Sequence, residues 1–393
     1  MAPFDETLLD DEGRRRAVDR SDVLRSLAGA GAQVRRAVAI AAETDLGLVA
    51  GGERPRAVHI AAVGGAEGVG TVLDLLAART GPVLLTADGS GPLPGWVGTL
   101  DLVVAVSLSG RADGPVRQAR EAARRGAQVL TIGAPDSPLA EAAHAARAAC
   151  TCRSSRVAGT RGRPCGGWSL APSWPAACGV VDVPGDVLGD VADRLDAQAE
   201  ACRPDAEYFV NPAKTLALDL SSRVPVVLGD GPVTVVAARA VRASMLARTA
   251  RTPSTWGRLP DAAAQVLACL SGPFTGAASA PDGGRDVFAD PYIDGPAGPE
   301  LGLLLLRDPR PTADGRPEEV ERHNTAQSIA DHAQSAGVRV LEHWAGPGHD
   351  LARLAELVAL TDYAATYLAI GHGLDPASAP GISELPLPRK APE

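Results

Sequence analysis

The stretch DLVVAVSLSGRADGPVRQAREAARRGAQVLTIGA, residues 101–134, decides the fold class of this chain. Its apolar run Leu102–Val106 predicts a fully buried strand, and the segment Pro115–Arg125 predicts a helix. A Ser-Leu-Ser-Gly turn at 107–110 joins the two. Free backbone N–H groups and the positive end of the helix dipole converge at such a junction, so the stretch is suited to binding an anion.

The same alternation of apolar strands and helices continues on both sides of this stretch. In the first half, strands are predicted at 57–65, 82–87, 102–109 and 127–134, and helices at 68–79, 115–125 and 137–148. In the second half, strands are predicted at 224–231, 301–308 and 338–345, and helices at 233–248, 317–336 and 351–370. Continuously apolar strands with helices between them indicate parallel sheets covered on both faces. We therefore predict an α/β fold with two doubly wound parallel-sheet domains and flanking helices.

The predicted domain organisation has three parts. Residues 1–50 form an N-terminal helical segment, residues 51–200 a first α/β domain, and residues 201–393 a second one. One amphipathic helix is predicted in the N-terminal segment, because apolar side chains recur there at three- and four-residue spacing, at Val23, Leu27, Ala30, Val34 and Val38. The Gly-, Pro- and Asp-rich stretch 271–300 is predicted as a long loop, either functional or disordered.

Composition and charge exclude several classes of function. The 393 residues are 45% hydrophobic and 22% charged, as in an ordinary globular protein long enough for two domains. A net charge of −9 argues against general binding to nucleic acid or to anionic membranes. No apolar run approaches the roughly 18 residues of a membrane helix, and the acidic start MAPFDETLLDDEG lacks the apolar region of a signal peptide. We expect a cytoplasmic protein.

Three small-residue turns follow predicted strands: Gly64-Gly65, the Ser107–Gly110 turn, and Gly229-Asp-Gly231. In open parallel sheets, ligands bind beyond the carboxyl ends of the strands, so each turn lies where a ligand would be held. Each is also explained as a tight connection between a strand and a helix, with no ligand.

Taken together, these residues resemble the sugar isomerase (SIS) fold, and more narrowly the bifunctional phosphoglucose/phosphomannose isomerase family. The resemblance is carried by VGGAEG (63–68), VSLSGRADG (106–114), NPAKTLALDLSSRVPVVLGDG (211–231) and LARLAELVALTDYAATYLAIGHGLDP (351–376). It implies aldose–ketose isomerisation of a hexose phosphate by proton transfer, with no cofactor or metal. It also implies that the substrate phosphate is held by Gly64, Gly65, Ser107, Ser109, Gly110 and Arg111. We expect the protein to be a homodimer.

The sequence departs from the family at the residues that transfer protons. The family's catalytic glutamate falls on Arg248, and its histidine falls on Ala263 or Ala264. No glutamate occurs between Glu207 and Glu300, so a shifted alignment does not restore the first group. The chain likewise has no histidine between residues 144 and 323.

Three supporting residues of the family also differ. The serine of the Gly-Gly-Ser turn falls on Ala66, and the threonine of the phosphate loop falls on Ala112. The lysine near the chain end falls on Pro386, with Lys390 close by. We therefore favour a hexose-phosphate-binding protein with weak or no isomerase activity.

The alternative is an active glucose-6-phosphate/mannose-6-phosphate isomerase with relocated acid and base groups. Its candidates are Asp261, His343 and Glu384. Asp261 is equally suited to cap the helix after Pro260, and the other two can be structural or solvated. A nicotinamide dehydrogenase is disfavoured because the order of the glycines in GAEGVG (65–70) is the reverse of that in the G-x-G-x-x-G dinucleotide fingerprint. A serine hydrolase is disfavoured because no G-x-S-x-G motif surrounds the serines of the 107–110 turn.

Five of the six cysteines crowd the region from Cys150 to Cys202, which includes the unusual stretch CTCRSSRVAGTRGRPCGGWSLAPSW (150–174). A zinc site is disfavoured because the stretch has no Cys-x-x-Cys knuckle. A genuine divergent loop is possible, with Arg163 as the nearest substitute for a substrate-binding arginine of the family. We favour a compensated frameshift, because reading one base earlier permits a strand, a Pro-Arg-Ala sequence and a helix. No function is assigned to these cysteines.

Overall fold

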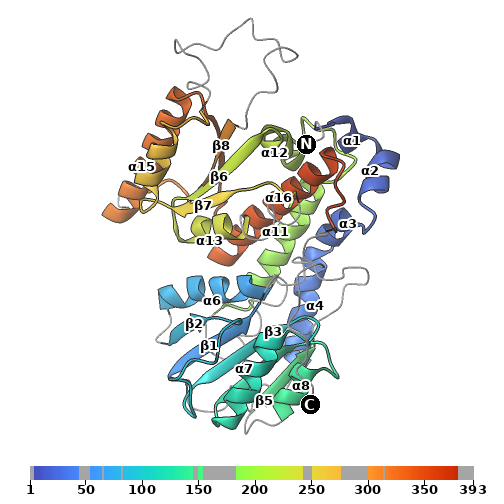
Figure 1. Cartoon of the computed structure of the whole chain (residues 1–393), viewed down its shortest axis with the longest axis vertical. Coiled ribbons are helices and arrows are strands. Elements are labelled where there is room, and N and C mark those ends of the chain that lie inside the picture. The colour runs from blue at the N-terminus through green and yellow to red at the C-terminus, as the bar shows by residue number, and fades with distance from the viewer. Residues whose placement is uncertain are drawn as a thin grey trace, which may run out of the picture.

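The computed structural model describes residues 4–43, 54–63, 66–80, 83–144, 149–153, 183–241, 250–275, 300–312 and 315–378. Two parallel β-sheets, each flanked by helices, make up this part of the chain (Figure 1). The predicted α/β class with two doubly wound parallel sheets is confirmed. Within the described residues, no helix is both long and apolar enough to cross a membrane.

The first sheet has the strand order β2-β1-β3-β4-β5, and every neighbouring pair is parallel. Its strands are β1 (Ala57–Ala62), β2 (Leu84–Ala87), β3 (Leu102–Ser107), β4 (Gln128–Gly133) and β5 (Ala149–Arg153). All six residues of β1 and of β3 are buried, as their unbroken apolar runs predict. The register places Ala62 beside Val106 and Ser107 beside Gly133, so the strands end together at one edge.

The second sheet repeats this order as β7-β6-β8-β9, also with parallel pairs throughout. Its strands are β6 (Arg223–Gly229), β7 (Thr255–Arg258), β8 (Glu300–Arg307) and β9 (Arg339–Trp344). Strands β6 and β8 therefore occupy the places that β1 and β3 occupy in the first sheet. In both sheets the chain reverses its direction of travel across the sheet between these two central strands, which creates a switch point with a crevice beyond the strand ends.

Thirteen helices are described. The N-terminal ones are α1 (Thr7–Asp10), α2 (Glu12–Val18), α3 (Val23–Ala28) and α4 (Ala30–Glu43), and those of the first sheet are α6 (Glu67–Thr80), α7 (Asp113–Arg124) and α8 (Pro138–His144). The remainder are α11 (Val187–Ala201), α12 (Pro212–Leu220), α13 (Pro232–Ala240), α14 (Ala263–Cys269), α15 (Pro317–Ser335) and α16 (Asp350–Gly371).

The apolar spacing predicts a single N-terminal helix, and this prediction is wrong. Gly29 ends α3, and a new helix, α4, starts at Ala30. Close packing explains the glycines here. A Cβ on Gly31 would lie 2.1 Å from the Asp196 carboxylate of α11, so only glycine lets the two helices approach. Helices α11 and α12 and the edge strands β5 and β7 are additional elements that the sequence patterns did not predict.

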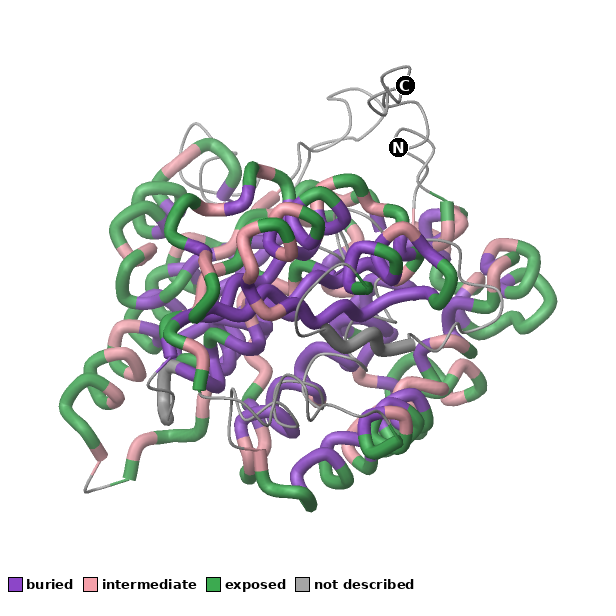
Figure 2. Tube along the Cα trace, turned by 90° about the horizontal axis from the view of Figure 1, so that it is seen from below, coloured by how far each residue is buried: buried purple, intermediate pink, exposed green. Residues whose placement is uncertain are grey.

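The hydrophobic core has three clusters that explain the layering of the molecule. The largest lies between the two sheets and contains residues of both, together with the inner helices. A second cluster packs α7 and α8 on the outer face of the first sheet, and a third packs α14 and α15 on the outer face of the second. Buried positions accordingly run through the centre of the trace, and exposed positions concentrate on the outer helices (Figure 2).

Helix α16 lies in the inner layer and joins the N-terminal helices to those of the second half. Every one of its residues except Glu356 is buried, and it contacts α1, α3, α11, α12 and α13. Tyr367 donates a hydrogen bond from its hydroxyl to the Cys202 carbonyl at 2.7 Å, and Arg194 of α11 forms an ion pair with Glu356 at 2.8 Å. Because α11 also packs on α4, this helix layer connects the N-terminal segment to both sheets.

Two predicted segments lie largely outside the described residues. They are the 271–300 stretch, of which 276–299 is not described, and the 150–174 stretch, of which 154–174 is not described. The part that is described shows that residues 149–153, as they stand in the sequence, already form an edge strand paired with β4. A strand at this position therefore does not require the shifted reading.

Candidate functional site

The turn after β3 lies at the switch point of the first sheet, next to the end of β1. Strand β3 ends at Ser107, two residues earlier than predicted, and the chain then makes a tight turn in which the Gly110 N–H donates to the Ser107 carbonyl at 2.8 Å. Gly110 has φ +66°, a left-handed conformation that glycine adopts without strain. A Cβ here would lie 2.0 Å from the Ser137 hydroxyl, so the backbone approaches α8 more closely than another residue allows.

Both serine hydroxyls of the turn accept hydrogen bonds from the backbone that follows. The Ser107 Oγ accepts from the Ala112 N–H at 3.3 Å, and the Ser109 Oγ accepts from the Arg111 N–H at 3.3 Å. A hydroxyl that accepts in this way still has its own proton to donate. Among the described residues no acceptor takes either proton, so both can be directed to a ligand oxygen.

Helix α7 starts at Asp113, two residues before the predicted start at Pro115, and no side chain caps it. The Asp113 carboxylate does not cap this helix. Asp113 lies inside the first turn, where it forms an exposed ion pair with Arg117 at 2.8 Å. The N-terminus of α7 therefore retains N–H groups without a side-chain cap beside the two hydroxyls, and the exposed Arg111 adds a positive charge.

A cavity of about 470 Å³ lies beside this turn, at the ends of β1 and β2. Its walls come from those strands, from α6, and from Arg239 of α13, so both halves of the chain contribute to it. Three carboxylates face it, those of Glu67, Asp74 and Asp88. Hydrogen bonds from the backbone N–H groups of Ser90 and Gly91 and from the Ser90 hydroxyl lower the pKa of Asp88, so its carboxylate stays ionised.

Neither Ser107 nor Ser109 is among the residues that line this cavity. The loop that follows β2 separates them, because α7 packs directly on it: a Cβ on Gly114 would lie 1.8 Å from the Gly89 carbonyl. The side chain of Arg117 also donates to the Ser90 carbonyl at 3.0 Å. The turn and the cavity thus share one wall, with hydroxyl donors on one side and carboxylate acceptors on the other.

His59 is a positioning residue that the sequence patterns did not reveal. It is buried in β1, with Nδ1 2.9 Å from the Thr86 hydroxyl and Nε2 2.9 Å from the Gln118 side-chain oxygen. Gln118 in turn donates to the Asp88 and Gly91 carbonyls at 2.9 Å. Together the two side chains hold the shared wall in place. The available signal was a lone histidine in an otherwise apolar strand.

The positions where the family has its other functional groups hold residues without acid or base chemistry. Ala66 is buried at the start of α6. Ala112 is the residue before α7, and its methyl group cannot cap that helix. Ala263 and Ala264 begin α14. Gly64, Gly65, Arg248, Pro386, Lys390 and Arg163 lie outside the described residues.

Two of the three candidate relocated groups, Asp261 and His343, are described, and the structure does not bring either of them to this site. Asp261 is exposed in the turn before α14, and its side chain does not cap that helix, because the residue before the helix is Ala262. His343 lies in β9, where burial lowers its pKa and keeps the ring neutral. Neither residue lines the cavity, and Glu384 is outside the described residues.

Within the described part of the chain, no group of three or more His, Cys, Asp or Glu residues is placed to hold a metal.

Comparison with known families gives one match, over residues 209–386, to the bacterial phospho-glucose isomerase C-terminal SIS domain. Residues 209–386 of the second half are therefore similar to a phosphoglucose isomerase-type SIS domain. This agrees with the resemblance that the sequence motifs indicate. No curated protein matches the chain.

Solved structures show that the SIS fold extends over nearly the whole chain. Tagatose-6-phosphate ketose/aldose isomerase from Escherichia coli is 15% identical, with a TM-score of 0.55, and the match covers 96% of this chain and 98% of that one. A glucose-6-phosphate isomerase-like protein from Thermus thermophilus is 20% identical, with a TM-score of 0.52 and coverage of 94% and 96%. The C-terminal domain of glucosamine-fructose-6-phosphate aminotransferase from Francisella tularensis is 11% identical, with a TM-score of 0.54 and coverage of 89% and 96%.

Proposed function

We propose that this chain binds a hexose 6-phosphate at the switch point of its first sheet and has weak or no isomerase activity. The observation that carries the proposal is the geometry of Ser107 and Ser109, whose hydroxyls accept from the backbone and keep their protons for a ligand. The uncapped start of α7 adds backbone N–H donors and the positive end of a helix dipole at the same place. These are the groups that bind a phosphate dianion.

The sugar ring is proposed to extend toward the cavity of about 470 Å³ beside the turn. Carboxylates such as Glu67, Asp74 and Asp88 accept hydrogen bonds from sugar hydroxyls, whereas they repel a phosphate. The division between donors at the turn and acceptors in the cavity therefore supports a ligand with a phosphate at one end and hydroxyls at the other.

Weak or absent turnover is proposed because the groups that should carry protons are missing. Each positioned general acid or base typically contributes on the order of a hundred- to ten-thousand-fold to the rate. The family's glutamate falls on Arg248 and its histidine on Ala263 or Ala264, and neither replacement transfers protons at neutral pH. The alternative, an active isomerase with relocated groups, requires Asp261, His343 or Glu384 to reach the ligand.

A titration calorimetry experiment tests the binding proposal. Wild-type protein is titrated with glucose 6-phosphate, mannose 6-phosphate and unphosphorylated glucose, beside the Ser107→Ala/Ser109→Ala variant and the exposed control Ser335→Ala. The phosphate esters are expected to bind more tightly than glucose, and the double variant is expected to lose about tenfold to a hundredfold in affinity. Equal binding by wild type and the double variant would show that the turn is only structural.

A coupled isomerase assay on the same samples tests the second half of the proposal. We expect no turnover near ordinary enzyme rates with either hexose phosphate. Robust turnover that disappears in Asp261→Asn, His343→Gln or Glu384→Gln would instead establish the relocated isomerase.

Assembly and location follow the same proposal. We propose a homodimer that acts in the cytoplasm, where hexose phosphates are available. Size-exclusion chromatography with light scattering measures the assembly directly, and a mass near that of one chain at micromolar concentration would contradict the dimer.

A further inference from the structure

The switch point of the second sheet holds a polar network that the proposed function does not use. Asp230 follows β6, and Arg307 and Asp308 end and follow β8, so they occupy the places that the glycine turn and the serine turn occupy in the first half. A cavity of about 250 Å³ opens beside them. It is lined by α15 and α16 and by the loop after β8, including Arg310, Arg322, His323 and Arg353.

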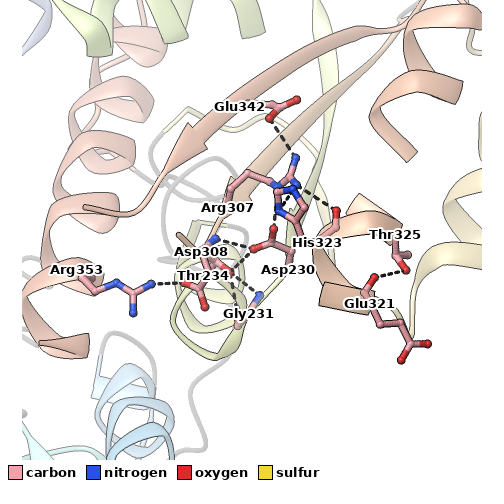
Figure 3. A network of polar contacts seen from close by, with 10 residues as sticks. All are labelled: Asp230, Gly231, Thr234, Arg307, Asp308, Glu321, His323, Thr325, Glu342 and Arg353. Carbon is pink, nitrogen blue, oxygen red and sulfur yellow. Dashed lines mark hydrogen bonds and ion pairs between the residues drawn. The ribbon is translucent and has the colours of Figure 1, made fainter. Parts of the chain in front are cut away.

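Two of the carboxylates that line this cavity, Asp230 and Asp308, each have a guanidinium partner (Figure 3). Asp230 accepts from the Arg307 Nε at 2.7 Å and from the Asp308 backbone N–H at 2.6 Å. Asp308 is paired with Arg353 at 2.6 Å. Glu319 lies 3.4 Å from the Arg316 guanidinium. Arg307 and Arg353 also pair with Glu342 at 3.1 Å and with Asp350 at 3.0 Å, so each carboxylate of the cluster has a guanidinium within ion-pair distance.

Arg310 and Arg322 are left over. Within the described part of the chain, neither guanidinium lies within ion-pair distance of a carboxylate, and Arg310 instead stacks over the Trp344 ring, 5.3 Å from its centroid. The Nε atom of Arg322 is buried and has no hydrogen-bond partner, and the same holds for the Nε atom of Arg353, whose side chain is 10% exposed. Buried unpaired donors are unfavourable, and an anion in the cavity would satisfy them.

His323 adds a further donor. Its Nδ1 lies 3.2 Å from the Arg307 Nη2, and because a guanidinium only donates, Nδ1 must be the acceptor. Burial and the neighbouring Arg307 lower the pKa of His323, so the ring is neutral and carries its one proton on Nε2. The cavity thus combines two unpaired guanidinium groups with a neutral N–H donor.

We infer that this cavity is a second anion site, which binds inorganic phosphate or the phosphate group of a small phosphate ester. Guanidinium groups match phosphate oxygens in geometry and charge. The volume admits a phosphate group and a short carbon skeleton, and it is below the range of about 300–1,000 Å³ usual for larger ligands. The inference does not rest on the proposed function of the first switch point, because the two sites share no residues.

Calorimetric titration with inorganic phosphate at constant ionic strength tests the inference. The Ser107→Ala/Ser109→Ala variant serves as the background, so that binding at the first switch point does not mask the second. We expect this variant to bind phosphate still, and we expect the additional changes Arg310→Gln/Arg322→Gln to weaken binding by about tenfold to a hundredfold. Equal phosphate binding by the two- and four-substitution proteins would overturn the inference, as would a background variant that binds no phosphate.

Matched variants separate a binding role from a structural one. Arg310→Lys/Arg322→Lys keeps the charge and is expected to retain measurable binding, whereas the exposed pair Arg25→Gln/Arg36→Gln on α3 and α4 should leave binding unchanged. Because Arg310 and Arg322 form no ion pair within the described chain, their loss should lower the thermal midpoint of unfolding only by the small contribution of the Arg310 contact with the Trp344 ring. A parallel titration with a hexose 6-phosphate decides between the two sources of the ligand: tighter binding than inorganic phosphate in the same background would indicate an ester.

Discussion

The two switch points occupy equivalent places in equivalent sheets, yet they are built from different chemical groups. The first uses the uncharged hydroxyls of Ser107 and Ser109 and a helix N-terminus, while the second uses the buried pair Asp230–Arg307 and surrounding guanidinium groups. Sheet topology fixes where a crevice forms, and the side chains decide what it can hold. A hydroxyl can exchange a bound water for a ligand oxygen at little cost in free energy. A buried charge that loses its partner, in contrast, destabilises the fold strongly.

The largest loss of unfolding free energy is expected for a substitution of Asp230. Its side chain is 4% exposed and that of Arg307 is 0% exposed, so Asp230→Ala would leave a buried guanidinium with Glu342, 3.1 Å away, as its remaining ion-pair partner among the described residues. Breaking a buried pair in this way typically costs about 3–5 kcal/mol of unfolding free energy. Ser107→Ala, the corresponding change in the first sheet, should cost about 1 kcal/mol. Urea unfolding followed by circular dichroism measures both.

The double variant Asp230→Ala/Arg307→Met provides the control for this effect. Replacing both charges by apolar groups removes the unpaired guanidinium, so much of the lost stability should return. Equal losses in Asp230→Ala and Ser107→Ala would mean that the two switch points do not differ in this respect.

The second prediction concerns pH. Burial raises the pKa of Asp308 from 3.8 to about 6, despite its pairing with Arg353. The folded protein therefore binds this proton more tightly than the unfolded chain does. The resulting stabilisation is complete below pH about 4 and is lost as the pH rises through about 6, a change of about 3 kcal/mol.

Chemical unfolding at several pH values between 4 and 7 tests this linkage. The stability of the wild type relative to Asp308→Asn should fall by about 3 kcal/mol over this range, because the amide does not titrate. Asp113→Asn, an exposed aspartate-to-asparagine change at the first switch point, is the control for the substitution itself. Parallel curves for wild type and Asp308→Asn would contradict the prediction.

The smallest expected effect is a gain at the first switch point. Ala112 precedes α7 in an extended conformation, with φ −65° and ψ 121°, and does not cap the helix. In Ala112→Thr the hydroxyl can accept from the Gly114 N–H and can still donate to a ligand. We expect about 1 kcal/mol of added stability and a several-fold gain in hexose 6-phosphate affinity.

Thermal unfolding and calorimetry together measure that gain. Ala112→Val has a similar shape without the hydroxyl and is the matched control. A gain of the same size in the valine variant would show that shape, and not the added hydroxyl, is responsible.

The central strands of both sheets were predictable because their apolar runs are unbroken. Strands β1, β3 and β8 are buried on both faces, and a continuous apolar run is the direct consequence of such a position. The edge strands β5 and β7 are short and carry charged or small polar residues, so they resemble loops in sequence. Their strand conformation depends on a neighbouring strand that lies far away along the chain.

The two candidate sites differ in the same way. The serine turn was visible because its hydroxyls and glycine lie within four consecutive residues, Ser107–Gly110. The second network was not, because Asp230, Arg307, Arg322 and Arg353 come from four separate elements and loops, and each resembles an ordinary surface charge in sequence. Only the folded arrangement shows which guanidinium groups are paired and which are left over.

The burial of α16 has a consequence for how the molecule unfolds. A helix that is covered on every side cannot be exposed without separating the layers around it, and this one packs on helices from the N-terminal segment through α13. Its amides should therefore exchange with deuterated solvent only when the whole protein opens, and should be the slowest in the chain. The N-terminal helices and the second half then behave as one cooperative unit, and the second half is not expected to fold when it is expressed without the N-terminal helices.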